Sequence, residues 1–185
     1  MNRTEQLERL LLERSVQRGD FTLASGLKSS YYIDCRPTTM SAEGLSLIGT
    51  LGLEAIRTEG WRADAVGGLT MGADPVAYAI AGASWSDPPP IDAFSVRKES
   101  KEHGTRRLVE GNFRKGHRVV VVEDVITTGG SALQAIGALR EAGAEIVGVL
   151  AVVDREQGGK EKIEDVVPRV VVLTTVTRLG LKPRI

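Results

Sequence analysis

The sequence has few of the features of exported or membrane-bound proteins. Its 185 residues contain a single cysteine, Cys35, so no disulfide can form within the chain and a reducing compartment is expected. No apolar run reaches the roughly 18 residues of a membrane span, and the first residues lack the continuous apolar core of a signal peptide. The sequence therefore predicts a soluble, cytoplasmic protein with no membrane partner.

An excess of charge of one sign is also missing from the chain as a whole. Lys plus Arg and Asp plus Glu number 24 each, and this zero balance predicts no nucleic-acid partner. The charge is nevertheless uneven, because residues 97–118 contain eight basic and three acidic residues, a local net charge of +5. A local positive field of this kind gathers anionic ligands.

Apolar strand patterns alternate with helical patterns along most of the chain. A length of 185 residues is that of one ordinary domain, so residues 1–185 are expected to form a single domain. Strands that alternate with helices predict an α/β fold with a central parallel sheet, covered by helices on both faces. Buried strands are expected at residues 63–69, 119–122 and 145–155, and further strands at residues 91–96 and 169–176.

Near the N-terminus, a helix and a hairpin are expected. Apolar residues at helical spacing run from about Thr4 to Arg18, and Gly19 is expected to end that helix. Residues 21–36 then have the pattern of two short strands around a turn that contains Lys28.

Local signals also predict the later helices. Ser41 is expected to cap a helix that Gly60 ends, and Asp74, followed by Pro75, to cap the next one. Residues 97–117 form a long charged segment with no apolar periodicity, and no element is predicted there.

One segment, VVVVEDVITTGGSA at residues 119–132, carries most of the chemistry. Its four valines have the composition of a strand buried on both faces of a parallel sheet. Glu123 and Asp124 follow where the strand is expected to leave the sheet, and ligands of such sheets bind at the carboxyl ends of the strands. A loop of hydroxyl-bearing residues and glycines then leads into a helix. The loop consists of Thr127, Thr128, Gly129, Gly130 and Ser131.

This loop has the properties of a phosphate cradle. Backbone N–H groups and hydroxyls at a helix N-terminus offer an anion unpaired donors and a partial positive charge. The sequence contains neither G-x-x-x-x-G-K-[ST] nor G-x-G-x-x-G. No sequence motif therefore supports a site for a nucleoside triphosphate or for a dinucleotide.

The acidic pair beside this cradle needs a further explanation, because a phosphate repels carboxylates. Sugar hydroxyls can donate hydrogen bonds to Glu123 and Asp124, and a Mg²⁺ ion shared with the ligand would neutralise them. A ribose 5-phosphate supplies the phosphate and the hydroxyls together. The plainer alternative is that the two acids belong to a solvated turn.

The segment VVVVEDVITTGGSA resembles the phosphoribosyl pyrophosphate-binding motif of the type I phosphoribosyltransferases, in which a hydrophobic strand, two acids and a small-residue loop follow one another. Two more segments are similar to those of the orotate-specific branch: LASGLKSSYYIDCR, residues 23–36, to its base-site segment, and RKESKEHG, residues 97–104, to its mobile catalytic loop. With VDRE at residues 153–156, the resemblance extends over most of the chain. It implies a central, mostly parallel sheet flanked by helices, with a small N-terminal hood contributed mainly by residues 1–40.

The resemblance implies an enzyme, a glycosyltransferase of the pentosyltransferase class. Its reaction would be the Mg²⁺-dependent transfer of ribose 5-phosphate from phosphoribosyl pyrophosphate (PRPP) to orotate. The products would be orotidine 5′-monophosphate and pyrophosphate, in de novo pyrimidine (UMP) biosynthesis. Mg²⁺ is expected to be held mainly by the substrate, with Glu123 and Asp124 reaching it at most through water. A homodimer that shares the catalytic loop across its interface is also implied.

The resemblance further implies a role for each candidate residue. Lys28 would reach orotate or PRPP from the hood. Glu123 and Asp124 would hold the ribose hydroxyls, and Thr127 to Ser131 the 5-phosphate. Arg97, Lys98, Lys101 and His103 would bind pyrophosphate. Thr128 and Arg155 would bind orotate. The catalytic residues that the resemblance implies are Lys101, His103 and Asp124.

A further loop, GGLTMGAD at residues 67–74, corresponds to one that cradles pyrophosphate. Thr70 and Met71 stand in it where some members have a Tyr-Lys pair.

Elementary chemistry agrees with these roles. Displacing pyrophosphate from an anomeric carbon builds positive charge on the sugar and negative charge on the leaving group, so catalysis is mainly electrostatic. A basic loop that closes over the leaving group supplies cations and expels water, and Lys101 or His103 could protonate the departing pyrophosphate. Arg155 suits a pyrimidine carboxylate, because its planar fork binds a carboxylate through two hydrogen bonds.

Two other functions stay open at the level of the sequence. A purine or uracil could replace orotate, and Arg155 would then face no carboxylate. A nucleotide-sensing regulator could bind RNA on the same fold without turnover, which requires a basic face outside the loop. The zero net charge argues against the regulator.

Overall fold

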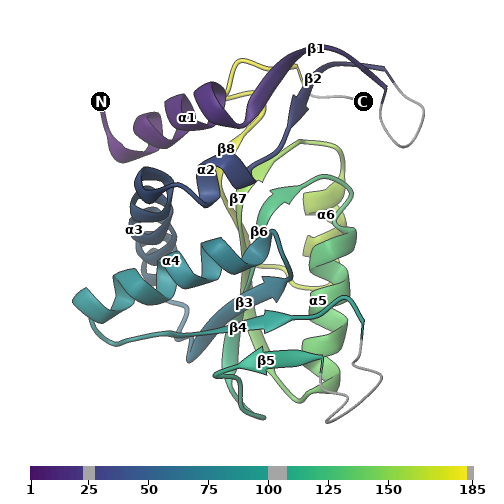
Figure 1. Ribbon diagram of the computed structural model, residues 1–185. Coiled ribbons are helices and arrows are strands. Elements are labelled where there is room, and N and C mark those ends of the chain that lie inside the picture. Colours follow the sequence, from purple (N-terminus) through teal and green to yellow (C-terminus); the bar gives the residue numbers. More distant parts are fainter. Residues whose placement is uncertain (23–27, 100–107, 183–185) are drawn as a thin grey trace.

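The computed structural model describes residues 1–22, 28–99 and 108–182. Its centre is a six-stranded sheet with the strand order β5-β4-β3-β6-β7-β8 (Figure 1). Every neighbouring pair is parallel except β4 with β5, so the predicted mostly parallel sheet is confirmed. The strands are β3 (Ala65–Leu69), β4 (Asp92–Val96), β5 (Val109–Gly111), β6 (Arg118–Ile126), β7 (Glu145–Asp154) and β8 (Val170–Thr175).

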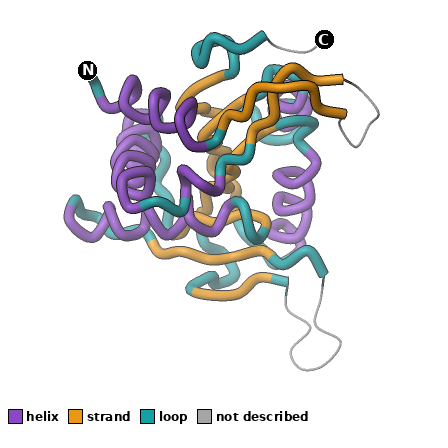
Figure 2. The backbone as a smooth tube through the Cα atoms, turned by 45° about the horizontal axis from the view of Figure 1, so that its top comes forward, coloured by secondary structure: helices purple, strands orange, loops and turns teal. Residues whose placement is uncertain are grey.

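Helices cover both faces of this sheet. Helices α3 (Ala42–Thr58) and α4 (Ala73–Ser86) lie on one face, and α5 (Gly130–Glu141) and α6 (Gly159–Glu164) on the other (Figure 2). Successive side chains of β6 point to opposite faces of the sheet, so this strand contributes to the apolar core on both sides. Val120 and Val122 pack with α3 and α4, whereas Val119 and Val121 pack with α5 and α6. All four valines are fully buried, which confirms the predicted strand. In the part of the chain that is described, no helix is long and apolar enough to cross a membrane.

The N-terminal hood consists of α1 (Arg3–Arg14), the hairpin of β1 (Val16–Thr22) and β2 (Lys28–Ile33), and α2 (Arg36–Thr39). The two strands pair antiparallel, as predicted. Helix α1 and the hairpin lie together at the top of Figure 1, where α1 packs on α3 and β8. The hood thus lies at one end of the main sheet.

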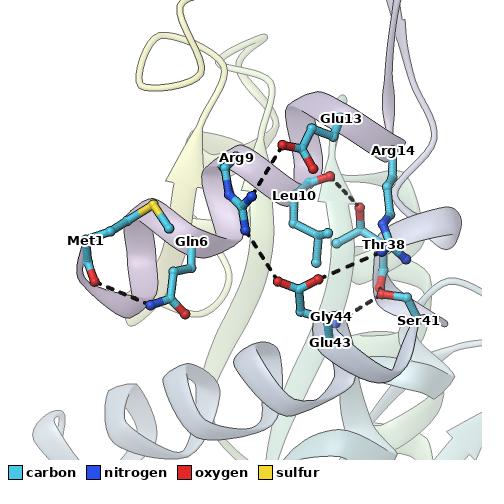
Figure 3. Close-up of polar contacts among 10 residues, drawn as sticks. All are labelled: Met1, Gln6, Arg9, Leu10, Glu13, Arg14, Thr38, Ser41, Glu43 and Gly44. Atoms are coloured by element: carbon cyan, nitrogen blue, oxygen red, sulfur yellow. Dashed lines mark hydrogen bonds and ion pairs between the residues drawn. The ribbon is translucent and has the colours of Figure 1, made fainter.

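Polar contacts fasten the hood to the helix below it (Figure 3). Glu43, in the first turn of α3, lies 3.5 Å from Nη2 of Arg9 and 3.8 Å from Nη2 of Arg14, both on α1. The Ser41 hydroxyl accepts a hydrogen bond from the Gly44 amide (3.0 Å), so the predicted cap of α3 is confirmed.

Several predicted boundaries were wrong. Helix α1 ends at Arg14 and not near Gly19, because Val16 already pairs with Ile33 in the hairpin. For the same reason Lys28 lies in β2, paired with Thr22, and not in the turn. The tertiary pairing of the strands here overrides the local helical spacing.

Two further elements differ from the prediction. Helix α4 begins at Ala73, so Asp74 lies inside its first turn and is not its cap. The charged segment after β4 contains the short edge strand β5, which pairs antiparallel with β4. A strand of three residues is too short to show a period in the sequence.

Candidate active site

The acidic pair lies within β6 and not at its exit. Pairing with β7 continues past Glu123 to Ile126, which pairs with Asp154, so the predicted place where the strand leaves the sheet is wrong. The long strand β7 supplies hydrogen-bonding partners to the polar end of β6 as well as to its valines. Glu123 and Asp124 are consequently only 6% and 8% exposed. This burial excludes the alternative of a solvated turn.

Burial changes the acidity of both carboxyl groups. Loss of hydration raises the pKa of Glu123 from 4.5 to about 9; the charge of Asp124 adds to this rise, and Lys98 opposes it. Burial also raises the pKa of Asp124. Neighbouring buried carboxylates are stable as anions only beside hydrogen-bond donors or a cation. The two carboxylates can therefore accept hydrogen bonds from sugar hydroxyls. Their oxygen atoms are also ligands of the kind that Mg²⁺ prefers.

The loop that follows β3 lies directly beside Asp124. A Cβ atom at Gly72 would be 2.5 Å from Oδ1 of Asp124. Within this loop the Thr70 amide donates to the Val96 carbonyl (2.8 Å), and the Thr70 hydroxyl donates to Oδ2 of Asp74 (2.6 Å). The loop that the resemblance connects with pyrophosphate is thus fixed next to the acidic pair.

The loop between β6 and α5 encloses a small cavity. Glu123 and residues 125–132 line a volume of about 200 Å³ at the N-terminus of α5. Gly129 has a φ of 82°, and a Cβ atom there would be 2.8 Å from the Gly159 carbonyl oxygen. A Cβ atom at Gly159 would be 2.4 Å from the Thr127 carbonyl oxygen. The glycines let two backbones meet, and the first-turn N–H groups of α5 suit the cavity to a phosphate.

Arg155 directly follows β7 and is only 7% exposed. Its amide donates to the Ile126 carbonyl (2.9 Å), and its guanidinium carbon lies 5.8 Å from the centre of the Tyr31 ring. Its Nε and Nη2 atoms are buried and have no hydrogen-bond partner among the described residues. A buried guanidinium with two unused donors fits an anionic ligand such as a carboxylate.

The basic segment begins at the carboxyl end of β4. Nη1 of Arg97 lies 4.0 Å from Oε1 of Glu110. The Lys98 carbonyl accepts a hydrogen bond from Nε2 of Gln134 (3.1 Å), which attaches this segment to α5. Two predicted catalytic residues of the segment lie outside the described residues: Lys101 and His103.

Three of the predicted ribose and base residues, Glu123, Asp124 and Arg155, lie near one buried thiol. Cys35 is fully buried, and its burial, together with the nearby charges of Asp124 and Asp34, raises the pKa of its thiol. Arg155 and Glu123 also act on this thiol electrostatically, Arg155 in the opposite direction. Charged groups from β6 and from the end of β7 are thus within electrostatic reach of one buried atom. Lys28 is exposed at the start of β2.

One residue of this region was not singled out from the sequence. Gly159 allows α6 to approach the phosphate loop, and the Gly158–Gly159 pair in front of a helical segment was the available signal. Tyr31 forms the aromatic wall beside Arg155. Strand alternation places one of Tyr31 and Tyr32 in the core, and the structure buries Tyr31, but nothing in the sequence connects it with Arg155.

Comparison with known proteins identifies the class that this fold and site define. A model of the phosphoribosyl transferase domain matches residues 42–175. The orotate phosphoribosyltransferase of Aquifex aeolicus (strain VF5) is 52% identical over 163 residues, 86% of this chain and 88% of that protein. That of Corynebacterium glutamicum (strain R) is 53% identical over 158 residues, 85% of this chain and 83% of that protein.

A solved structure agrees with these relatives. Orotate phosphoribosyltransferase of Mycobacterium tuberculosis H37Rv, in complex with Fe(III) dicitrate, has a TM-score of 0.87 and 45% identity, and the match covers 97% of this chain and 100% of that one. The chain belongs to the phosphoribosyltransferase family and, within it, to the orotate phosphoribosyltransferases. The resemblance based on its sequence motifs is confirmed.

Proposed function

We propose that the chain transfers ribose 5-phosphate from PRPP to orotate in the presence of Mg²⁺, in de novo pyrimidine biosynthesis. The bond from C1 of the ribose to pyrophosphate breaks, a bond from C1 to a ring nitrogen of orotate forms as that nitrogen releases its proton, and orotidine 5′-monophosphate and pyrophosphate leave. The observation that carries this proposal is the buried pair Glu123 and Asp124 beside the glycine-lined cavity of α5. The Mycobacterium tuberculosis relative has also been solved in complex with PRPP.

The ribose and its phosphate are proposed to bind along the end of β6. The 5-phosphate accepts hydrogen bonds from the loop Thr127 to Ser131 at the N-terminus of α5. The ribose hydroxyls donate to Glu123 and Asp124, which stabilises the two buried carboxylates as anions. As positive charge develops on the sugar in the transition state, the same carboxylates stabilise it.

The departing pyrophosphate is proposed to lie between the loop after β3 and the basic segment. Arg97 and Lys98 supply positive charge at the end of β4, and Lys98 is already close enough to Glu123 to act on its pKa. Lys101 and His103 follow in the same segment and would complete the neutralisation, one of them giving a proton to the leaving group. Closure of such a segment also removes water from the reacting atoms.

Orotate is proposed to bind beside Arg155. The two buried donors of this guanidinium match the two oxygens of the orotate carboxylate. Thr128 and Lys28 complete the base site in this proposal. Uracil and the purines lack the carboxylate and would leave the Arg155 donors unsatisfied, which favours orotate as the acceptor base.

Mg²⁺ is proposed to be held mainly by the oxygens of PRPP. Within the described residues, no group of three or more His, Cys, Asp or Glu side chains is arranged to hold a metal ion. Glu123 and Asp124 carry the hard oxygen atoms that Mg²⁺ prefers, and they would reach the ion through water. When bound, Mg²⁺ would neutralise charge on the pyrophosphate group.

A homodimer is part of the proposal. Helix α4 and the loop before it expose three large apolar side chains, each more than half accessible to solvent: Met71, Tyr78 and Trp85. Methionine and aromatic residues are enriched in protein interfaces. A second copy of the chain would cover this surface, and the basic segment of one subunit would reach the site of the other.

The enzyme is proposed to act in the cytoplasm. Cys35 is free and fully buried, and an unpaired thiol suits a reducing compartment. Fractionation of the source cells, with the chain detected by antibody, tests this location.

The proposed reaction is tested by the ultraviolet absorbance of orotate with purified protein, PRPP and Mg²⁺. Uracil, xanthine and adenine are run beside it as competing bases, and a chelator is added to parallel samples. Consumption of orotate alone, and only with free Mg²⁺, is the expected result. Reaction of another base would refute the role of Arg155, and consumption of orotate in the chelator would refute the role of Mg²⁺.

A further inference from the structure

The buried guanidinium of Arg155 is held by a residue of the hood. The Tyr31 ring on β2 is only 3% exposed, and the Arg155 Cζ atom lies 5.8 Å from its centre. At this distance an aromatic face attracts a cation. The Tyr31 hydroxyl in turn donates a hydrogen bond to the Lys182 carbonyl (3.0 Å), near the C-terminus. Tyr31 therefore connects Arg155 with a segment 27 positions further along the chain.

The same C-terminal segment, residues 176–182, fixes the backbone on both sides of Arg155. The Val176 amide donates to the Asp154 carbonyl (3.0 Å), and the Thr177 amide donates to Oε2 of Glu156 (2.8 Å). Glu156 has a φ of 54°, in the left-handed region that residues other than glycine rarely adopt. Its unusual conformation turns the chain so that its carboxylate meets this segment.

The C-terminal segment is itself anchored to the hood. Oε1 of Glu8, on α1, accepts a hydrogen bond from the Thr174 hydroxyl (2.8 Å) and pairs with Nε of Arg178 (2.8 Å). Leu179 and Leu181 are buried in the same core cluster as Tyr31. The hood, the C-terminal segment and the end of β7 thus form one packed unit around Arg155.

This unit addresses a physical problem of the site. The guanidinium of Arg155 must stay buried and keep two donors free until an anion arrives, although free donors cost energy when they are desolvated. The Tyr31 ring stabilises the positive charge of Arg155 through the electrostatic attraction of its face. This contact leaves the N–H groups of the guanidinium free. A shift of about 1 Å in such a binding group is enough to weaken recognition severalfold.

We infer that Tyr31 and the C-terminal segment 176–182 position Arg155 and thereby set the preference for a pyrimidine that carries a carboxylate. The inference rests on the proposed function, in which Arg155 binds the orotate carboxylate. Tyr31 is a positioning residue in this account, since it acts on the substrate only through Arg155.

A double-mutant cycle tests the inference. Tyr31→Phe keeps the ring and removes the hydroxyl that bonds to Lys182, and it should raise the KM for orotate about threefold to tenfold. The kcat and the KM for PRPP should change by less than about twofold. In the Arg155→Ala background, Tyr31→Phe should leave the KM for orotate unchanged, because the group that it positions is gone.

One control variant and three contrary outcomes complete the test. Tyr32→Phe makes the same change on the neighbouring, partly exposed residue of β2 and should leave the KM for orotate unchanged. An equal rise in KM from Tyr31→Phe with and without Arg155 would overturn the inference in favour of general packing. No rise from Tyr31→Phe, while Arg155→Ala alone raises the KM, would overturn it and leave the proposed function intact. No effect of Arg155→Ala would overturn both.

A second pair of variants tests the segment without touching Tyr31. Glu156→Ala removes the acceptor of the Thr177 amide and should raise the KM for orotate selectively, whereas Glu156→Gln keeps an acceptor oxygen and should restore it. Thermal unfolding is measured on both. A rise in the KM for PRPP equal to that for orotate would show a general loss of structure and would overturn the inference.

Discussion

The Oδ1 atom of Asp124 occupies the space that a side chain at position 72 would need: a Cβ atom at Gly72 would be 2.5 Å from it. Nonbonded carbon and oxygen atoms do not approach so closely, so the Asp124 carboxylate can keep this position only with a glycine at position 72. At this point the proposed pyrophosphate loop meets the proposed ribose site. Any displacement of the Asp124 carboxylate therefore disturbs both the proposed pyrophosphate loop and the proposed ribose site.

Gly72→Ala should lower kcat/KM for PRPP by about tenfold or more, because the new methyl group pushes the Asp124 carboxylate out of place. The backbone at position 72 is helical, with φ −62° and ψ −42°, so alanine meets no conformational strain. Gly137→Ala is the matched control, since Gly137 is exposed on α5 and a Cβ atom at that position would have nothing within 4 Å. Steady-state kinetics of both variants check the prediction, and equal activities would contradict it.

Asp124→Asn should lower kcat/KM at least about tenfold, which corresponds to about 1.4 kcal/mol of transition-state stabilisation. The same change should raise the melting temperature of the ligand-free protein, because burial raises the pKa of Asp124 and a neutral amide avoids the cost of burying a charge. Kinetics and thermal unfolding are measured on one preparation. A wild-type kcat/KM would remove Asp124 from the proposed site.

The pattern of apolar residues in the sequence was sufficient to predict an element where burial alone determines its structure. The four valines from Val119 to Val122 predicted a strand covered on both faces, and each is fully buried. The end of that strand was misplaced, because it depends on the length of β7, which pairs with it as far as Ile126. When the neighbouring strand determines how far a strand extends, the sequence of that strand alone does not predict its end.

The candidate site was predictable in its chemistry and less so in its geometry. Glu123, Asp124 and Arg155 were selected by residue type and order, and the structure brings all three into one buried region. Gly159 was missed and the contact of Tyr31 with Arg155 was not foreseen, because each depends on a segment distant in the sequence. Such contacts exist only after folding, and a single sequence does not encode them locally.

The stability of the ligand-free protein should fall with rising pH because of Glu123. Its pKa is raised from 4.5 to about 9 in the folded state, so the folded protein keeps a proton that the unfolded chain releases. The stabilisation is complete below the ordinary pKa of 4.5 and is lost as the pH rises through about 9. Glu123→Gln cannot ionise, so its melting temperature should exceed that of the wild type by a margin that grows between about pH 5 and about pH 9.

Thermal unfolding without PRPP or Mg²⁺ measures this margin. Glu141→Gln, at the exposed end of α5, is the control and should follow the wild type across the range. A margin for Glu123→Gln that stays constant with pH would show that the folded protein does not retain the Glu123 proton.

If the basic segment is shared between subunits, as proposed, two variants of low activity should regain activity when they are mixed. Lys101→Ala removes the cation that a subunit would give to its partner, and Asp124→Asn removes a carboxylate that each subunit keeps in its own site. In a mixed dimer, one site then carries both defects and the other carries none. After subunit exchange, about one quarter of the wild-type rate should return, because about half of the dimers are mixed and one of their two sites is intact.

The measurement is the rate of orotate consumption before and after mixing, with exchange driven by brief mild denaturation and followed by native mass spectrometry of differently tagged subunits. Each variant treated alone in the same way is the control and should keep its own low rate. Mixed dimers that form without regaining activity would mean that Lys101 serves the site of its own subunit, because in that case every site would carry one defect.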